Sequence, residues 1–179
     1  MSQNQSEEIR EYYNLDSLVN AQVKLISDRN YRLEKKVILN MKQEDTVLNF
    51  GNEEWINEFK LFNEADLNVP SNSGMYNFTK GLSDPTSNLL YDQYLPKNGF
   101  QPSVLSLEIY YFNTIDQVKK VKIYEAEDND LYFSFKRLEL NFSNEEGQSR
   151  LVSYSVAGIQ KLLSRDSVIY QINGRILID

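Results

Sequence analysis

The chain contains neither histidine nor cysteine among its 179 residues. Histidine supplies most acid–base catalysis near neutral pH and is the commonest metal ligand, and cysteine supplies the thiolate nucleophile. Their absence excludes Ser-His-Asp and Cys-His catalysis, zinc sites, haem ligation by either residue and thiol redox chemistry. The sequence therefore predicts no metal and no cofactor. Any catalysis would depend on carboxylates, lysine, tyrosine or serine.

Glycine and proline are also scarce, with seven and four residues, which excludes collagen-like and linker-like chains. No apolar run approaches the roughly 20 residues that a membrane-spanning helix needs. The first eight residues are polar and lack the apolar core of a signal peptide. Hydrophobic residues make up 41% and aromatic residues 12%, enough to build a core. We expect one domain over residues 1–179, with residues 1–7 as a flexible tether.

Positive charge is in deficit, with 19 basic against 26 acidic residues and a net charge of −7. The densest basic run, Lys119, Lys120 and Lys122, alternates with Val121 and Ile123, as on a sheet with one solvated face. Such a chain repels phosphate backbones. We therefore exclude nucleic acid as a partner.

Two segments have helical periodicity. Apolar residues recur at three- and four-residue spacings from Glu7 to about Asn30, with a later start at Asn14 or Ser17 as an alternative. The second helix starts at Asn52 as N-cap and ends before Pro70. Its expected buried stripe consists of Trp55, Ile56, Phe59, Phe62 and Ala65.

Strand periodicity covers most of the remaining chain. We expect strands over 31–41 and 46–50 with a turn at 42–45, and a long irregular connection over 67–86 with one short strand at 75–79. Glu125–Asp130 has the composition of an acidic turn. The apolar phase changes between Phe135 and Leu138, so we expect a β-bulge near Lys136–Arg137. Short connections require antiparallel pairing. The predicted fold is α+β, with two N-terminal helices packed on one face of a curved antiparallel β-sheet meander of about seven strands.

Three segments carry a resemblance to a known group of proteins. They are residues 55–70 (WINEFKLFNEADLNVP), residues 13–18 (YNLDSL), and residues 153–161 (SYSVAGIQK) followed by 170–174 (YQING). In these segments the chain resembles small, uncharacterised lipoproteins of the Bacteroidota. The resemblance implies a cell-envelope address and a lipid anchor on a cysteine at the mature N-terminus. This chain has Met1 and no cysteine, so the expected anchor cysteine would precede Ser2 in a precursor. The resemblance implies no activity.

The candidate ligand-binding residues are aromatic and aliphatic. A carrier would need a preformed pocket or groove between the second helix and the strands. Its expected lining is Trp55, Phe59, Phe62, Ile109, Tyr111, Phe133 and Phe135. The alternative is that the same residues simply dock helix on sheet, which the stripe's spacing favours.

Three polar groups are weaker candidates. Glu58 and Asp66 edge the apolar stripe and form a possible polar site, although Asp66 is more readily explained by bonds to the backbone of the Asn68–Ser71 turn. The acidic residues of Glu125–Asp130 could offer oxygen ligands to calcium, but they lack the spacing of a calcium loop. Ser153 and Ser155 alternate with Tyr154, and a dyad with Lys161 would need a buried lysine.

These observations favour a non-enzymatic cell-envelope lipoprotein module that presents an apolar pocket or surface to a lipid or protein partner. The alternative is a carboxylate-dependent hydrolase acting on an envelope glycan. A dry aromatic pocket would favour the first hypothesis. Two facing carboxyl groups in a cleft would favour the second, and a filled core would leave a structural or protein-docking role.

Overall fold

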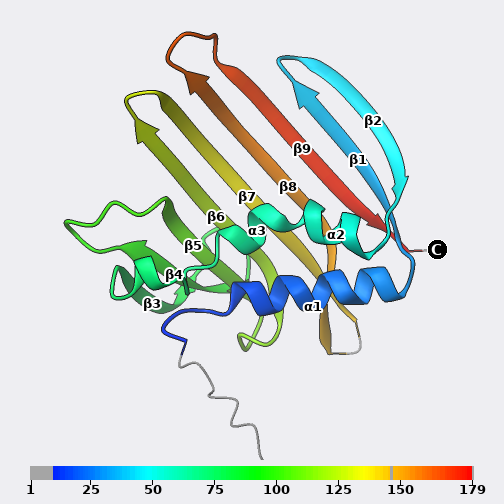
Figure 1. The fold of residues 1–179 in the computed structure, drawn as a ribbon. Helices are drawn as coiled ribbons and strands as arrows, with labels where there is room; N and C mark the ends of the chain where they lie inside the picture. Colours follow the sequence, from blue (N-terminus) through cyan, green and yellow to red (C-terminus); the bar gives the residue numbers. More distant parts are fainter. Residues whose placement is uncertain (1–9, 146, 179) are drawn as a thin grey trace, which may run out of the picture.

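The structure is a computed structural model that describes residues 10–145 and 147–178. The expected tether, residues 1–7, lies outside these ranges. The described residues form an α+β fold in which helices lie against one face of a single antiparallel sheet (Figure 1). This much of the predicted fold class is confirmed.

The first helix, α1 (Leu15–Asp28), begins at the later of the two expected places. Asn14 is its N-cap, and the Asn14 side chain accepts a hydrogen bond from the backbone N–H of Ser17. The second expected helix is two short helices, α2 (Asn52–Glu58) and α3 (Lys60–Glu64), separated at Phe59. Ile56 is 47% exposed, so its place on the buried stripe was wrong. It lies one position, about 100°, round the helix from Trp55, and that rotation turns it to solvent.

The sheet of the described residues has nine strands, not the expected seven, in the order β2-β1-β9-β8-β7-β6-β5-β4-β3. The long irregular connection is shorter than expected, because a 3-10 turn, η1 (Pro70–Asn72), is followed by strand β3, which runs beyond the short strand expected there. The chain is also more than a meander, since β1 pairs with β9. The strands are β1 (Arg32–Leu39), β2 (Lys42–Asn49), β3 (Tyr76–Ser83), β4 (Leu90–Pro96), β5 (Val104–Tyr111), β6 (Val118–Asn129), β7 (Tyr132–Glu145), β8 (Gln148–Leu162) and β9 (Val168–Leu177).

Two turns differ from the expected positions. The first hairpin turns at Asn40 and Met41, both with positive φ (46° and 70°), so Lys42–Asp45 belongs to β2. Positive φ at both central residues matches the twist of the flanking strands, as in a type I′ turn. The expected acidic turn is strand as far as Asn129, and the chain reverses at Asp130 and Leu131.

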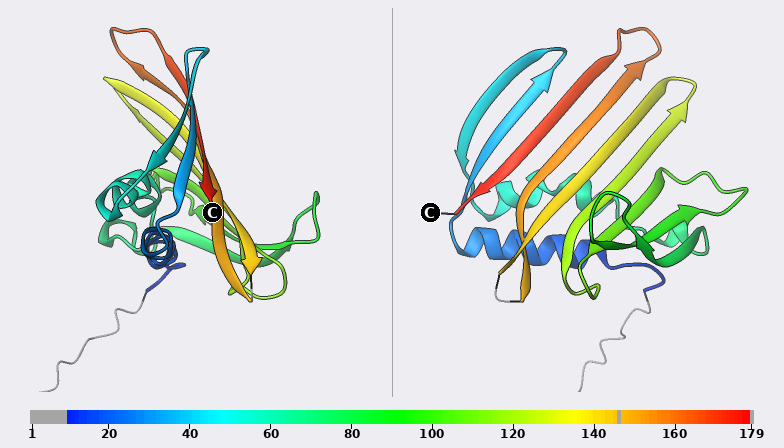
Figure 2. Two further views of the ribbon diagram at one scale, coloured as in Figure 1. Left: turned by 90° about the vertical axis from the view of Figure 1, so that its right-hand side faces the viewer. Right: turned by 180° about the vertical axis from the view of Figure 1, so that it is seen from behind.

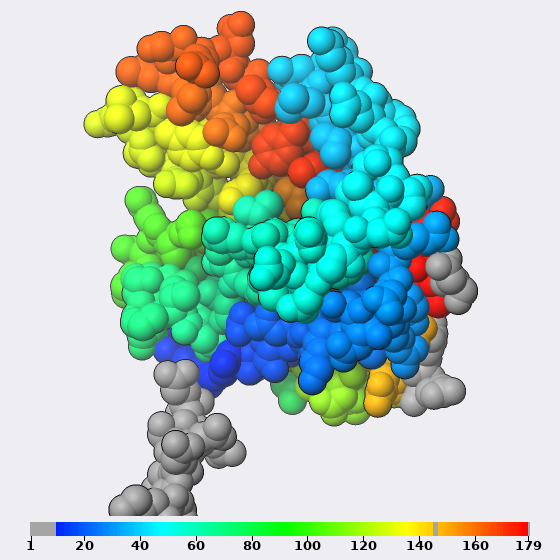
Figure 3. Space-filling model, turned by 45° about the vertical axis from the view of Figure 1, so that its right-hand side comes forward, coloured from blue at the N-terminus to red at the C-terminus, as the bar shows by residue number. Residues whose placement is uncertain are grey.

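The helices cover only part of the sheet (Figures 1 and 2). We call the face toward the helices the inner face and the opposite face the outer face; no helix of the described residues lies on the outer face (Figure 2). The hairpins of residues 37–45, 124–137 and 157–171 rise beyond the helices, and we call them the open half (Figure 3). The remaining sheet, with the helices against it, is the covered half.

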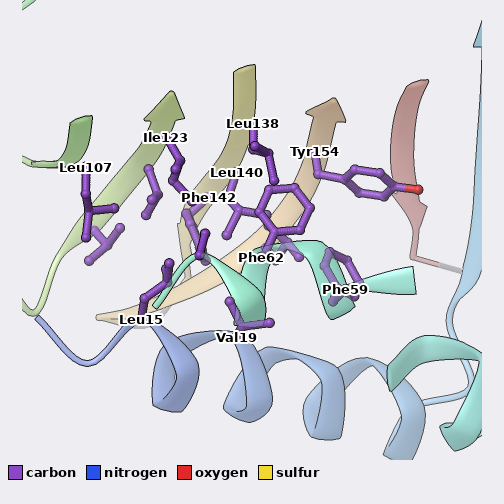
Figure 4. Packing of buried hydrophobic residues seen from close by; sticks show 14 of the residues in the cluster. Leu15, Val19, Phe59, Phe62, Leu107, Ile123, Leu138, Leu140, Phe142 and Tyr154 are labelled. Carbon is purple, nitrogen blue, oxygen red and sulfur yellow. The ribbon is translucent and has the colours of Figure 1, made fainter. Parts of the chain in front are cut away.

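The core fills the covered half (Figure 4). Side chains of α1, α2 and α3 pack against the inner face of β5–β9. The largest fully buried side chains of helices, strands and connections have less than 2% exposure. They are Trp55, Phe59, Phe62, Leu15, Ile26, Leu33, Leu67, Leu107, Ile109, Ile123, Leu138 and Leu140.

The expected bulge at Lys136–Arg137 was wrong. Strand β7 pairs with β8 without interruption from Tyr132 to Asn141, and the register shift lies between Asn141 and Phe142. Alternation therefore puts Leu138 and Leu140 on the inner face, and Phe133 and Phe135 on the outer face. No bulge is needed, because the two phenylalanines do not belong to the core.

Candidate functional site

The expected ligand pocket is occupied by protein side chains. Trp55, Phe59, Phe62 and Ile109 have 0% exposure and Tyr111 has 4%. The Phe59 and Phe62 rings lie edge-on to the ring of Tyr154, with centroids 5.2 Å and 6.0 Å away (Figure 4). Such edge-to-face contacts are those of a packed core.

Phe133 and Phe135, the other two residues of that set, lie elsewhere. They are 39% and 38% exposed on the outer face. The structure therefore brings five of the seven residues into the buried interior of the covered half. It places the remaining two on the opposite side of the sheet, in the open half.

Glu58 is the centre of a polar cluster at the border between the two halves. Its carboxylate pairs with Lys35 Nζ at 2.7 Å and accepts a hydrogen bond from the Tyr154 phenol. Burial raises the pKa of Tyr154, and the hydrogen bond and charge of Glu58 raise it further. The phenol therefore stays protonated as a donor, and the cluster ties α2 to β1 and β8.

A glycine makes this cluster possible. Gly174 lies beside Tyr154 in the sheet, and a Cβ at position 174 would come within 2.0 Å of the tyrosine ring. No side chain other than hydrogen fits under the ring. Gly158 lies beside Tyr170 in the open half, where a Cβ would lie 2.7 Å from both the phenol oxygen and the backbone oxygen of Phe135.

Asp66 lies in a different place from Glu58, and the two do not form one site. The Asp66 carboxylate accepts hydrogen bonds from the backbone N–H groups of Asp16 and Asn68, both at 2.7 Å. It thus bonds the first turn of α1, where the helix dipole favours an anion. A cavity of about 530 Å³ adjoins it, lined by Arg10, Glu11, Tyr12, Asp16, Asn63, Asp66, Leu67, Asn68, Val69, Pro70 and Ser73.

A second cavity, of about 540 Å³, is a polar basin on the outer face. Two neighbouring rows across β7, β8, β9, β1 and β2 supply most of its lining: Glu34, Lys36, Asp45, Glu139, Asn141, Ser153, Ser155, Asn173 and Arg175, with Tyr154 and Gly174. Both serines lie opposite Tyr154 in the alternation, as expected. Ser155 and Lys161 are six residues apart along one strand, about 20 Å. A Ser-Lys dyad between them is therefore excluded.

The acidic residues of β6 are divided between the two faces. Glu125 is 7% exposed on the inner face and pairs with Lys136 at 2.8 Å. Burial by itself would lower the pKa of Lys136, but the hydrogen bond and charge of Glu125 leave it raised. Asp128 is exposed and three residues further along the strand, on the outer face. Within residues 10–145 and 147–178, no three acidic side chains converge where a metal ion could bind.

The open half carries an unusual set of exposed apolar side chains. Met41, Leu131 and Leu163, at the tips of three neighbouring hairpins, are 97%, 66% and 71% exposed. All three tips lie at the same end of the sheet (Figures 1 and 2). Ile169 of β9 lies on the outer face next to Ile159 of β8 and is 61% exposed. We call Met41, Leu131 and Leu163 the tip residues.

Sequence reasoning missed the tip residues, although it had a signal. Each tip residue stands next to a polar residue at a place where the chain reverses: Asn40-Met41, Asp130-Leu131 and Leu163-Ser164. Turns favour glycine, asparagine and aspartate, so a large apolar side chain there needs an explanation other than local conformation.

No protein-family model, curated protein or solved structure matches the chain. In the part of the chain that the structure describes, no helix has the length and apolar character to cross a bilayer.

Proposed function

We propose that the protein is a non-enzymatic cell-envelope module, anchored by a lipid on an upstream cysteine, whose open half binds a protein partner through the tip residues. The main observation behind this proposal is the exposure of Met41, Leu131 and Leu163 at one end of an otherwise well-packed fold. Exposed apolar groups gathered at one end of a fold are typical of interaction surfaces in soluble proteins.

Met41 is the most informative of the three. It has a φ of 70°, a region that a non-glycine residue enters at a cost, and its side chain is 97% exposed. Neither local conformation nor burial therefore favours methionine at this position. Methionine is flexible and polarisable, which suits it to binding surfaces.

The charges of the open half favour a protein over an anionic membrane surface. Its three hairpins carry seven acidic and five basic residues. Peripheral binding to anionic lipids depends on clustered lysine and arginine, and the net charge here has the opposite sign. The packed core also argues against a carrier, since an acyl chain would need a preformed apolar cavity.

The hydrolase alternative has less support. Glu34 and Glu139, the two glutamates of the polar basin, stand three strands apart, which puts about 14 Å between their backbones. Glycosidases hold their carboxyl groups about 5–9.5 Å apart across the scissile bond. The third carboxylate of the basin, Asp45, is nearer to Glu34, because it lies on the adjacent strand β2. Asp45 accepts a hydrogen bond from Gln43 at 2.7 Å and Glu34 pairs with Arg175 at 2.7 Å, so both carboxylates already have partners.

Site-specific photo-crosslinking in cells of the source organism tests the proposal. A photoreactive phenylalanine analogue at Leu131 or Leu163 should yield a covalent adduct with one protein. Phe112 is the matched control, because it is 44% exposed but lies in the β5–β6 connection at the opposite end of the sheet. Absence of a protein adduct from both tip positions, or the same adduct from position 112, would contradict the proposal.

The anchor is tested separately by the gene. We expect the reading frame upstream of Ser2 to encode an apolar segment followed by a cysteine. A native start codon at Met1 with no such segment would remove the lipoprotein part of the proposal and leave the binding surface to be judged by crosslinking.

A further inference from the structure

The outer face of the open half carries a second surface, distinct from the tips. We infer that this surface is a homodimer interface, in which two copies stack outer face on outer face about a two-fold axis that runs along β7. The inference goes beyond the proposed function, since it concerns a different face and a different partner.

The surface is defined by three neighbouring rows across β6, β7 and β8. The first row is Tyr124, Arg137 and Ala157; the second is Ala126, Phe135 and Ile159; the third is Asp128, Phe133 and Lys161. All nine residues have the alternation that points to the outer face, opposite to the buried Ile123, Leu138 and Val156. We call these nine residues the outer patch.

The outer-face residues of β6 are complementary in size and charge to those of β8 in a second copy. Rotation about an axis along β7 places β6 of one copy over β8 of the other at the same height. The small Ala126 then faces the large Ile159, and the large Tyr124 faces the small Ala157. In the third row, the carboxylate of Asp128 faces the ammonium group of Lys161.

The centre of the patch supplies the apolar contact. Phe133, Phe135 and Arg137 lie on the axis strand and would each meet their own copy. The two phenylalanines are 39% and 38% exposed. Arg137 is exposed at the edge of the patch, and its long side chain must extend away from the axis to keep the two guanidinium groups apart. Exposed aromatic residues at the centre of a patch are the usual anchors of protein interfaces. Aligned sheets cross at about 30°, and the long Lys161 side chain can follow the offset that this angle produces.

The pairing of β6 residues with β8 residues in size and charge favours a second copy of this chain over an unrelated partner. A large residue opposite a small one, twice, and an acid opposite a base are satisfied by the chain's own surface, with no other protein required. Self-complementarity of this kind is what a two-fold interface needs. The axis lies along the strands, so the tip residues of both copies point the same way and stay accessible.

The size of the patch sets the expected strength. Three rows at about 7 Å and three to four strands at about 4.8 Å span an area of roughly 300–400 Å² on each copy. This is about half of the standard area of a stable interface. We therefore expect a reversible dimer that forms at high protein concentration, as on a crowded membrane surface, and dissociates on dilution.

Sedimentation velocity across a concentration series is the first test. The wild-type chain should shift from monomer to dimer between about 10 µM and about 1 mM, the range expected of a small interface. Phe135→Glu places two carboxylates against each other on the axis and should weaken dimerisation at least tenfold. Phe112→Glu, at a similarly exposed position outside the patch, should leave it unchanged.

A charge-exchange pair and a crosslinking experiment distinguish loss of the interface from misfolding of a variant. Asp128→Lys alone should weaken the dimer, and Asp128→Lys with Lys161→Asp should restore it. Because the chain has no cysteine, Phe135→Cys provides a unique thiol. Stacked sheets lie about 10 Å apart, whereas a disulfide needs Cα atoms within about 7 Å. A short bis-maleimide should therefore link Phe135→Cys chains and not Phe112→Cys chains.

Three results would overturn the inference: a monomer at every concentration, a dimer that Phe135→Glu does not weaken, or charge exchange without rescue. Loss of dimerisation through Leu131→Ser or Leu163→Ser, with Phe135→Glu silent, would place the contact at the tips instead. The photo-crosslinks at Leu131 and Leu163 should persist in Phe135→Glu, so the two proposals can fail independently.

Discussion

The covered and open halves are built from the same strands but differ in which face is apolar. On β7, Leu138 and Leu140 face the helices and are fully buried, whereas Ser134 and Lys136 occupy the same face further up. The apolar residues of that upper segment, Phe133 and Phe135, are on the other face. On β7, the apolar residues therefore change from the inner to the outer face at the level where the helices end. The pairing register of β7 with β8 stays unbroken at that level.

This contrast shows what limits the core. The strands β6–β9 extend beyond the helices. On β6 and β7 the inner face becomes polar where no helix remains to cover it, with the Lys136–Glu125 pair at that level, whereas β9 keeps Val168 and Tyr170 on that face. The length of the helical layer therefore determines the extent of the core. The open half is left with exposed apolar side chains on its outer face and at its tips.

The largest expected difference between the halves is in stability. Phe59→Ala should lower the free energy of unfolding by about 3–5 kcal/mol, because it opens a cavity in a fully packed site. Phe135→Ala should lower it by less than about 1 kcal/mol, because this side chain is already 38% exposed. Urea denaturation of monomeric protein gives both values. Equal costs would mean that the open half is also part of the core.

The two close tyrosine–glycine pairs sharpen the comparison. Gly174→Ala should cost about 1–3 kcal/mol, because Tyr154 is 3% exposed and its ring cannot move away from a new Cβ. Gly158→Ala should also be destabilising, because a Cβ there would lie 2.7 Å from the backbone oxygen of Phe135, and movement of the Tyr170 ring does not relieve that contact. The double variant Tyr154→Ala with Gly174→Ala should cost less than the sum of the two single changes. Thermal unfolding measures all four variants, and simple additivity of Tyr154→Ala and Gly174→Ala would contradict the predicted close contact between the two residues.

The free energy of unfolding at alkaline pH should depend on Tyr154, which lies at the border between the halves. The pKa of Tyr154 is raised in the folded state, so unfolded chains lose the phenol proton first above about pH 10. The stability that Tyr154 contributes is therefore complete below pH 10 and falls as the pH rises further. Tyr154→Phe should be less stable than wild type at pH 8 by about 1–3 kcal/mol, the usual contribution of a hydrogen bond to a charged group. That gap should narrow between pH 10 and 11.5, and a constant gap would show that Tyr154 ionises equally in both states.

The smallest expected effect is at a tip. Met41→Gly should raise the free energy of unfolding by about 0.5 kcal/mol, because glycine adopts a φ of 70° without strain. The same change should reduce partner crosslinking from Leu131, if the three tip residues act together. Lys42→Gly, one residue further along and already in β2, serves as the control and should be destabilising.

Local pattern was sufficient for much of the covered half. The spacing of Trp55, Phe59 and Phe62 predicted their burial, and Asn14 marked the start of α1. Both features depend on residues within one or two turns of each other. The burial of β6 from Val121 to Glu125, and of β7 from Ser134 to Phe142, follows period two for the same reason.

Non-local features were not accessible in this way. Alternation shows that Phe133 and Leu138 lie on opposite faces, but it does not show which face a helix covers. The pairing of Leu33 with Ile176 joins residues 143 positions apart, and nothing in either strand specifies the other. The ligand pocket was expected because both phenylalanines were assigned to the core.

The pairing of β1 with β9 has a consequence for how the protein is made. A ribosome releases α1, β1 and β2 early, yet the strand that joins this hairpin to the sheet is among the last segments synthesised. Until then Leu33 has no neighbour on one side, and α1 has only a partial surface to cover. Closure across so many residues is entropically slow. The first hairpin therefore stays without its neighbour in the sheet for most of the chain's synthesis, and a truncation that removes β9 should release this hairpin from the sheet.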